Sequence, residues 1–346
     1  MHPFRRLIVI IDGPNPSFSY YFASRLERQP EVPAHIFNLA DTPAHIEPSV
    51  FDGALVVFCR YANTRWLHFL HGIRIHLAGV ALFLDDDIPA LCRDRTVPLP
   101  SRLRLWWKGP SQWPRLTPLL GRIIVSTPML AERFAEAAPL ILPPIAGTMD
   151  VQPPPDRTGP LRIGYHATTS HLAEHRMLAP ILGTVLAAEP DCTMDVIASG
   201  RAARLWRGDD RVRILPPRPW PQYRAETAQH GPHILLAPLL PTPANLARAA
   251  TKRIDAARAG AALLVSEAAI YHPSAEEHAL GMLAPLSPAA WEAAILALCR
   301  EPERRSRLAT LNRTHVLAAR EAAAKLFAPT GENGWILVTG NQQPAE

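Results

Sequence analysis

The sequence lacks the features that mark several large classes of protein. It has four cysteines in 346 residues and no Cys-x-x-Cys pair, which excludes the common zinc and thiol-redox motifs. No stretch approaches the roughly 18 apolar residues of a membrane-spanning helix. The apolar run at 7–12 is too short for a signal peptide, and no small-residue cleavage site follows it. We therefore expect a cytoplasmic protein with reduced cysteines.

Lysine is rare as well. Only Lys108, Lys252 and Lys325 are lysines among 36 basic residues, and the net charge is +5 at pH 7. A mildly basic chain suits an anionic partner, such as a nucleotide, an acidic lipid or a nucleic acid, without choosing among them. Lys252 draws attention because it lies three residues before Asp255, in a predicted helix that ends at Gly260.

Short apolar runs alternate with helical patterns along the whole chain. The expected strands are 7–12, 34–40, 54–60, 80–87, 122–127 and 140–145, then 161–167, 193–199, 212–217, 233–239 and 262–267. The expected helices include 17–28, 62–78, 128–137, 171–189, 221–231, 288–300 and 302–327. Continuous apolar strands separated by helices predict parallel sheets covered on both faces. We predict an α/β fold with two tandem Rossmann-like domains.

A stretch rich in proline and glycine, without periodicity, divides the chain at 149–160. We predict one domain over 1–148, a second over 161–328, and a weakly ordered tail at 329–346. Ligands of parallel sheets bind at the carboxyl ends of the strands. The expected site is therefore the cleft between the two domains.

Several stretches occur in an informative order: GRIIVSTPMLAERF (121–134), LRIGYHATTSH (161–171), MDVIASG (194–200), HILLAPL (233–239) and TKRIDAARAGAALLVS (251–266). Together they resemble the GT-B glycosyltransferases, in the branch with a degenerate Glu-x7-Glu motif that is common in bacterial surface-polysaccharide biosynthesis. The resemblance implies a nucleotide-diphospho-sugar donor on the second domain and a glycan or lipid-linked acceptor on the first. It implies no bound metal and no cofactor.

The segment before Gly260 is the first candidate donor site. A diphosphate needs cations and backbone N–H groups, and a lysine in an early helical turn such as Lys252 offers a point charge. The resemblance gives Asp255 the place of the acid that holds the ribose hydroxyls. It puts the first glutamate of the motif at Ala247, where it is missing, and Asn245 is expected to share its work with Lys252. Alternatively, the charged residues of this helix form a solvated, ion-paired face.

The turn after the strand at 161–167 is the second candidate. Gly164, His166, Thr168, Ser170 and His171 lie where backbone N–H groups and side chains can reach a phosphate, and we predict that they contact the donor. The segment is not a Gly-x-Gly-x-x-Gly motif, so a dinucleotide-binding fold gains little support. A simple helix cap explains the hydroxyl residues equally well.

Acidic residues at strand ends are candidates for catalysis. Asp12 follows the first strand, and Asp85 follows the fourth in the run Asp85–Asp87. Paired carboxylates suit a divalent metal, but the resemblance implies none. If the enzyme inverts anomeric configuration, Asp12 or Asp85 serves as the base, and Lys252 stabilises the leaving diphosphate. If it retains configuration, no protein base is required.

The stretch 93–122 carries six arginines and one lysine against one acid, together with Trp106, Trp107 and Trp113. Basic residues with interfacial tryptophans fit an anionic membrane surface, so we expect an association at the inner face of the cell membrane. Alternatively, the tryptophans face the core. No nucleic-acid-binding motif accompanies the stretch, and no nucleic-acid partner is expected.

The predicted function is that of a glycosyltransferase. A non-catalytic subunit with the same fold, which binds a partner transferase or a glycan, is the alternative, because the motif is incomplete. A sugar epimerase is a third option.

Overall fold

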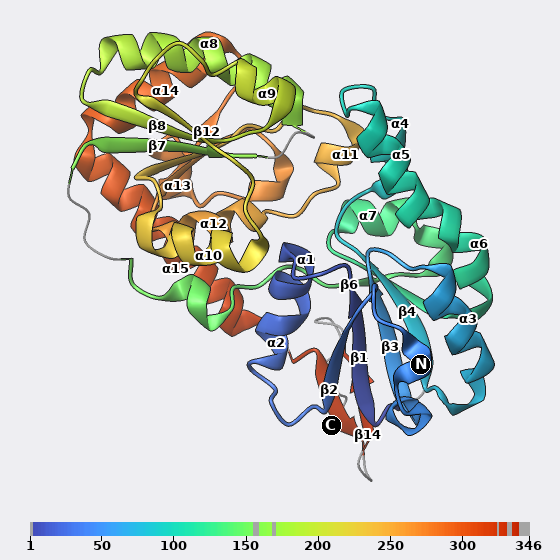
Figure 1. Ribbon diagram of the computed structural model, residues 1–346. Helices are drawn as coiled ribbons and strands as arrows, with labels where there is room; N and C mark the ends of the chain where they lie inside the picture. Colours follow the sequence, from blue (N-terminus) through green and yellow to red (C-terminus); the bar gives the residue numbers. More distant parts are fainter. Residues whose placement is uncertain (1–2, 155–158, 168–170, 324, 331–333, 339–346) are drawn as a thin grey trace.

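The computed structural model describes residues 3–154, 159–167, 171–323, 325–330 and 334–338. These residues form two α/β domains, each built on a six-stranded sheet (Figure 1). Every strand pairing within these two sheets is parallel. The predicted fold class is confirmed.

The first sheet has the strand order β2-β1-β3-β4-β5-β6. Its strands are β1 (Arg6–Ile11), β2 (Ala34–Asn38), β3 (Ala54–Cys59), β4 (Gly79–Leu84), β5 (Leu120–Val125) and β6 (Leu140–Ile141). Its helices include α1 (Pro16–Phe18), α2 (Ser24–Leu26), α3 (Thr64–Gly72), α4 (Ile88–Arg93), α5 (Leu99–Lys108), α6 (Trp113–Leu116) and α7 (Pro128–Arg133). All six residues of β3 are apolar and buried, as expected for a strand covered on both faces.

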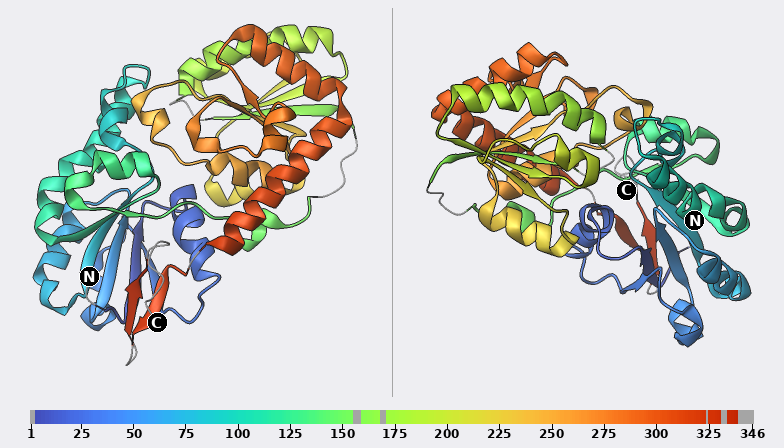
Figure 2. Two further views of the ribbon diagram at one scale, coloured as in Figure 1. Left: turned by 180° about the vertical axis from the view of Figure 1, so that it is seen from behind. Right: turned by 45° about the horizontal axis from the view of Figure 1, so that its top comes forward.

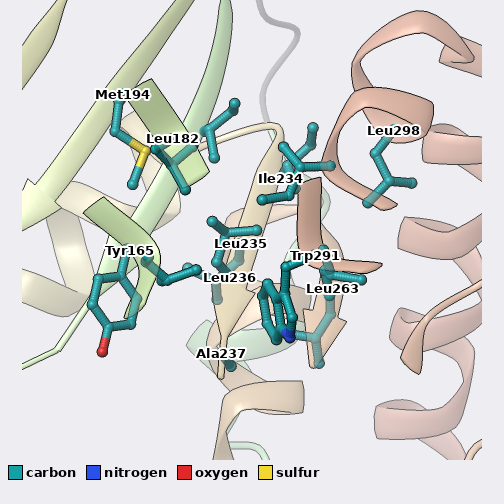
Figure 3. Packing of buried hydrophobic residues seen from close by; sticks show 14 of the residues in the cluster. Tyr165, Leu182, Met194, Ile234, Leu235, Leu236, Ala237, Leu263, Trp291 and Leu298 are labelled. Carbon is teal, nitrogen blue, oxygen red and sulfur yellow. The ribbon is translucent and has the colours of Figure 1, made fainter. Parts of the chain in front are cut away.

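The second sheet has the order β12-β11-β10-β7-β8-β9. Its strands are β7 (Leu161–His166), β8 (Cys192–Ile197), β9 (Val212–Leu215), β10 (Ile234–Ala237), β11 (Ala262–Ser266) and β12 (Leu283–Ala284). Its helices are α8 (Leu172–Ala188), α9 (Gly200–Arg204), α10 (Trp220–His230), α11 (Pro243–Leu246), α12 (Thr251–Ala259), α13 (Ala275–Ala279), α14 (Pro288–Arg300) and α15 (Pro302–Ala322). Leu236 and Leu263 of the sheet pack with Trp291 of α14 in the core (Figure 3).

The predicted strands are all present. The sequence did not reveal β12, which has only two residues, nor the two strands that follow α15 near the end of the described residues. The helix expected before Gly260 is α12, and the short helix α11 lies in the segment that precedes it. Gly260 ends α12 in the left-handed conformation (φ 58°), which confirms the predicted stop. The first helix, expected at 17–28, contains a π-helical turn at Ser19–Ala23 between α1 and α2.

The C-terminal part of the chain returns to the first domain. α15 runs from the second domain towards the first sheet (Figure 2), and the antiparallel strands β13 (Phe327–Thr330) and β14 (Gly334–Leu337) follow it. Phe327 is buried in the first domain's core, and Trp335 exchanges two backbone hydrogen bonds with Phe4. The prediction of a weakly ordered tail after Pro329 is therefore wrong for Gly334–Leu337, because this segment forms a strand that packs against the apolar core of the first domain.

The predicted linker at 149–160 also begins with defined structure. Thr148–Val151 form a 3-10 turn, and the Asp150 side chain is buried. Within the described residues, no helix combines the length and the apolar character that crossing a membrane requires.

Candidate functional site

A cleft of about 710 Å³ lies between the two domains. From the first domain, Pro14 follows β1, Arg60 follows β3 and Asp85 follows β4. From the second domain, His166 is the last residue of β7 and Ile197 the last of β8. The carboxyl ends of both sheets thus meet at this cleft, as predicted for parallel sheets.

Lys252 lies in the first turn of α12, and its side chain lines the cleft. Its Nζ donates hydrogen bonds to the carbonyl oxygen of His166 (3.1 Å) and to Oδ2 of Asp255 (2.9 Å). An ammonium has three N–H donors, so these two contacts leave one for a ligand. Burial lowers the pKa of Lys252, but the Asp255 carboxylate outweighs burial and the pKa is raised overall. The cation therefore persists at neutral pH.

Asp255 is held by side chains from both domains. Its Oδ1 accepts hydrogen bonds from the Tyr20 hydroxyl (2.5 Å) and from Arg258 (2.6 Å), while Oδ2 accepts from Lys252. Burial raises the pKa of Asp255, but Lys252 and Arg258 outweigh burial and lower it. The alternative of a solvated helix face is wrong, because Asp255 is only 7% exposed and α12 packs between the domains.

Arg258 extends this network to the linker. Its guanidinium is fully buried and donates to the Tyr20 hydroxyl (2.9 Å), to Thr227 Oγ1 (2.9 Å) and to Asp150 Oδ1 (3.0 Å). Asp150 also pairs with Arg224 at 3.1 Å. The sequence did not reveal Arg258 or Tyr20. Arg258 lies one helical turn after Asp255, and this spacing in the sequence could have predicted that the two side chains form an ion pair.

An aromatic wall closes one side of the cleft. Trp220 and Tyr223 of α10 are stacked with their ring centroids 5.6 Å apart, and both line the cleft. Trp220 Nε1 donates to Ser19 Oγ (2.7 Å), and the Tyr223 hydroxyl lies 3.2 Å from Nδ1 of His166. Sequence reasoning gave these rings no role. Their spacing of three residues on a helix that follows a strand end could have predicted that both rings face the cleft.

The residues predicted near the end of β7 divide into two groups. His166 and His171 line the cleft, and burial together with the Lys252 charge lowers the pKa of His166 to about 4. Gly164 lies inside β7, where an added Cβ would come within 2.5 Å of Pro232, so its small size serves packing rather than the predicted turn. Thr168 and Ser170 lie outside the described residues.

Two carboxylates of the run after β4 line the cleft with an arginine between them. Arg60 Nε lies 3.3 Å from Asp85 Oδ1, and Arg60 donates to Asp86 Oδ2 (2.7 Å). Asp85 Oδ2 accepts from the Ser17 hydroxyl (2.5 Å). The third acid, Asp87, caps α4 instead. Arg60 itself adopts φ 72°, a left-handed conformation that strains a residue with a Cβ.

The two carboxylates differ in their proton affinity. Burial raises the pKa of Asp85, and the Asp86 charge adds to the rise against the opposing effect of Arg60. Burial also raises the pKa of Asp86, but Arg248 and Arg60 outweigh it, so that pKa is lowered. Both carboxylates are already ion-paired with arginine side chains, whereas a metal site needs carboxylates that are free to bind the ion. Among the described residues, no three His, Cys, Asp or Glu side chains are grouped to hold a metal ion.

Arg248 connects the two walls of the cleft. Its Nε lies 3.6 Å from Asp86 Oδ1, and its NH1 lies 3.2 Å from Nε2 of His171. Asn245, expected to contact the donor, is not among the residues that line the cleft. It is buried and donates to Glu174 Oε1 (3.0 Å) and to the Leu240 carbonyl (2.9 Å). The structure therefore brings Arg248 to the cleft in place of Asn245.

Asp12 and Ala247 also lie away from the residues that line the cleft. The Asp12 carboxylate pairs with Lys108 Nζ at 2.5 Å. Ala247 is completely buried against the core of the first domain, and its carbonyl accepts a hydrogen bond from Thr127 Oγ1 (2.8 Å). A glutamate has no room at that position in this arrangement of the domains.

No model of a known protein family matches this chain, and no curated protein matches it in sequence. Solved structures do match. Sucrose-phosphate synthase from Thermosynechococcus elongatus superposes with a TM-score of 0.59 at 11% identity, over 91% of this chain and 94% of that one. The chain has the GT-B fold.

Two further structures with the GT-B fold support this. A putative UDP-N-acetylglucosamine 2-epimerase from Listeria monocytogenes matches with a TM-score of 0.52 at 12% identity, over 93% of this chain and 98% of that one. TarM matches with a TM-score of 0.52 at 6% identity, and the match covers 79% of this chain and 53% of that one. These superpositions establish the shared GT-B fold. At such low sequence identity they say nothing about the reaction, which depends on the residues of the cleft.

Proposed function

We propose that the protein is a glycosyltransferase that moves a sugar from a nucleotide-diphospho-sugar to a glycan or lipid-linked acceptor, in polysaccharide biosynthesis. The observation that carries this proposal is the Lys252 ammonium in the first turn of α12, with one N–H left for a ligand in the interdomain cleft. The donor occupies the wall formed by the second domain, and the acceptor occupies the opposite wall.

The cleft suits a leaving diphosphate. Five cationic side chains and three carboxylates line it among the described residues: Arg60, Arg104, Arg218, Arg248 and Lys252, and Asp85, Asp86 and Asp255. The N-terminus of α12 adds a partial positive charge beside Lys252. Negative charge that develops on the diphosphate as the glycosidic bond to the sugar breaks is stabilised by these groups. The stacked rings of Trp220 and Tyr223 offer an aromatic surface for the base.

On the acceptor wall, Asp85 is the one proposed general base that lines the cleft. Its raised pKa brings it nearer to neutral pH, where a base works well. In an inverting reaction Asp85 takes the proton of the acceptor hydroxyl. In a retaining reaction it orients that hydroxyl, and the leaving diphosphate takes the proton. The match to the Listeria structure, a putative UDP-N-acetylglucosamine 2-epimerase, supports the donor class, since UDP-N-acetylglucosamine is a nucleotide sugar.

A thermal-shift screen with UDP, GDP and ADP and their sugars tests the donor site. A nucleotide at 100 times its Kd adds about 2.7 kcal/mol of stability, which raises the melting temperature by several degrees. We expect Lys252→Ala to abolish this rise for the nucleotide that binds, and Lys252→Arg to keep part of it. Lys325→Ala is the matched control, because Lys325 is exposed and lies outside the cleft. If no nucleotide stabilises the wild-type protein, the donor assignment is wrong.

One observation favours a second function, a non-catalytic subunit that binds a partner transferase or a glycan. Ala247 is buried where the motif has a glutamate, and both oxygens of Asp255 already have partners. Nucleotide sugar that is neither hydrolysed nor transferred by the purified protein would support this function. Turnover of the nucleotide sugar without an acceptor would instead indicate an epimerase.

A further inference from the structure

Helix α5 has an unusual surface for a helix of a folded domain. None of its ten residues is buried. Leu99, Leu103, Trp106 and Trp107 are 59%, 58%, 49% and 67% exposed. Their spacing of four, three and one residues puts them on one face of the helix. A contiguous group of large apolar side chains on the surface marks a binding site.

The flanks of this face are strongly basic. Arg93, Arg95 and Arg115 are exposed, and in the described part of the chain none of them takes part in an ion pair. Asp94 is the one acid of the stretch 93–122, and it accepts hydrogen bonds from Thr96. The partner of this face therefore has an apolar interior and an anionic surface.

Trp113, the third tryptophan of the stretch, packs edge-on against Phe134 with 6.0 Å between ring centroids. The alternative prediction, that the tryptophans of this stretch face the core, is therefore correct for Trp113 and wrong for Trp106 and Trp107. These two project from the first domain, on the segment that Figure 1 shows beside α11.

The opposite side of α5 belongs to the cleft. Ser101, Arg104 and Leu105 line it, and so do Leu91 of α4 and Val97 of the turn between the helices. One helix thus carries an exposed apolar face and a wall of the cleft.

We propose that α5 docks this protein on an anionic lipid bilayer, with Trp106 and Trp107 in the interfacial region and the flanking arginines on the lipid headgroups. Resting on the proposed function, the acceptor is then an amphiphile whose apolar chain stays in the bilayer while its polar end reaches the cleft. Charge complementarity selects a membrane over an uncharged apolar partner.

Sedimentation with vesicles tests the docking. We expect the wild-type protein to bind phosphatidylglycerol/phosphatidylcholine vesicles at least tenfold more tightly than pure phosphatidylcholine vesicles, and less tightly as salt rises. The double variant Trp106→Ser/Trp107→Ser is expected to lose at least tenfold in binding. Arg93→Gln/Arg95→Gln is expected to lose the preference for anionic vesicles. Ile75→Ser is the control, since Ile75 is 83% exposed on another segment and its variant should bind like the wild type.

All substituted side chains are exposed, so the melting temperatures of these variants should equal that of the wild type. Failure of the wild type to bind anionic vesicles, or undiminished binding of the tryptophan variant, overturns the proposal. A change of oligomeric state in the tryptophan variant without vesicle binding by the wild type would assign the face to a second copy of the chain. Stabilisation by a nucleotide is measured on the same proteins, so vesicle binding without nucleotide binding would refute the glycosyltransferase and leave the docking intact.

Discussion

At the scale of single residues, Asp255 joins the two domains through hydrogen bonds from Tyr20, Lys252 and Arg258. The sequence predicts that Lys252 and Asp255 lie at the cleft, because their place relative to a strand end and a helix stop is local information. Tyr20 could not be predicted as a partner. It lies 235 residues from Asp255 along the chain, and only the packing of the domains brings them together.

Replacing Tyr20 by phenylalanine should destabilise the protein. The change removes the hydrogen bonds of the hydroxyl with Asp255 and Arg258 in a fully buried position. We expect a loss of about 1–3 kcal/mol in the free energy of unfolding, measured by urea denaturation. Tyr165→Phe is the control, since Tyr165 is also buried and its hydroxyl has no hydrogen-bond partner among the described residues. Equal stability of both variants would contradict the role of Tyr20.

Two histidines, the half-buried His166 and the buried His175, should make stability depend on pH. Burial lowers the pKa of His166 and of His175 to about 4, from an ordinary value of 6.5. His175 Nδ1 accepts a hydrogen bond from Trp206 Nε1 (2.9 Å), which an imidazolium cannot do. Because the folded-state pKa is depressed, the stability is fully present above pH 6.5 and is lost as the pH falls towards 4. Each histidine contributes a slope of up to about 1.4 kcal/mol per pH unit.

Urea denaturation of the wild type and of His166→Asn between pH 7.5 and pH 5 measures this slope. The variant should lose less stability over the interval than the wild type. An identical pH dependence would show that His166 is not the group that titrates.

At the scale of elements, α11 and α12 separate where the first domain contacts the second. The alternative of a solvated face requires one continuous helix over 245–259, because only then do its apolar and charged residues repeat at helical spacing. The break at 247–250 comes from tertiary contacts that periodicity does not contain: Ala247 is buried against the first domain, and Thr127 donates to its carbonyl. The break is what puts Lys252 in a first helical turn rather than in the middle of a long helix.

Ala247→Glu therefore should not restore a working motif. The carboxylate would enter the apolar core of the first domain, at a position that is completely buried. We expect a loss of at least about 3 kcal/mol in unfolding free energy or a forced separation of the domains, checked by urea denaturation and by solution scattering. Ala318→Glu on the exposed side of α15 is the matched control and should be close to neutral. A variant as stable as the control, with raised activity, would contradict this reading of the break.

At the scale of the whole molecule, the polar contacts between the domains cross the cleft at several points. Thr127 reaches Ala247, Tyr20 reaches Asp255, and Ser19 accepts from Trp220. The division into two sheets was predictable, because it follows from the order of apolar runs. The return of α15 and β13 to the first domain was not, because the contact of Gln29 with Phe327 joins residues that lie 298 positions apart in the sequence.

Phe327→Ala tests the contribution of this return. Phe327 is completely buried and packs edge-on against Phe4, with 5.7 Å between the ring centroids. Loss of such a side chain costs about 3–5 kcal/mol, which thermal or urea denaturation will register as lower stability of the first domain. Leu205→Ala is the control, because Leu205 is 38% exposed. A loss no larger than that of the control would mean that the hairpin does not support the first domain.

The pairing of Phe4 with Trp335 has a consequence for synthesis on the ribosome. Domains usually fold in the order in which they emerge, the N-terminal one first. Here the nascent first domain keeps part of its apolar surface uncovered until the residues of β13 and β14, which follow the second domain in the chain, have been translated. These strands complete the first domain only after the second domain has left the exit tunnel, so a product terminated before them would retain an exposed apolar surface for chaperones and proteases to recognise.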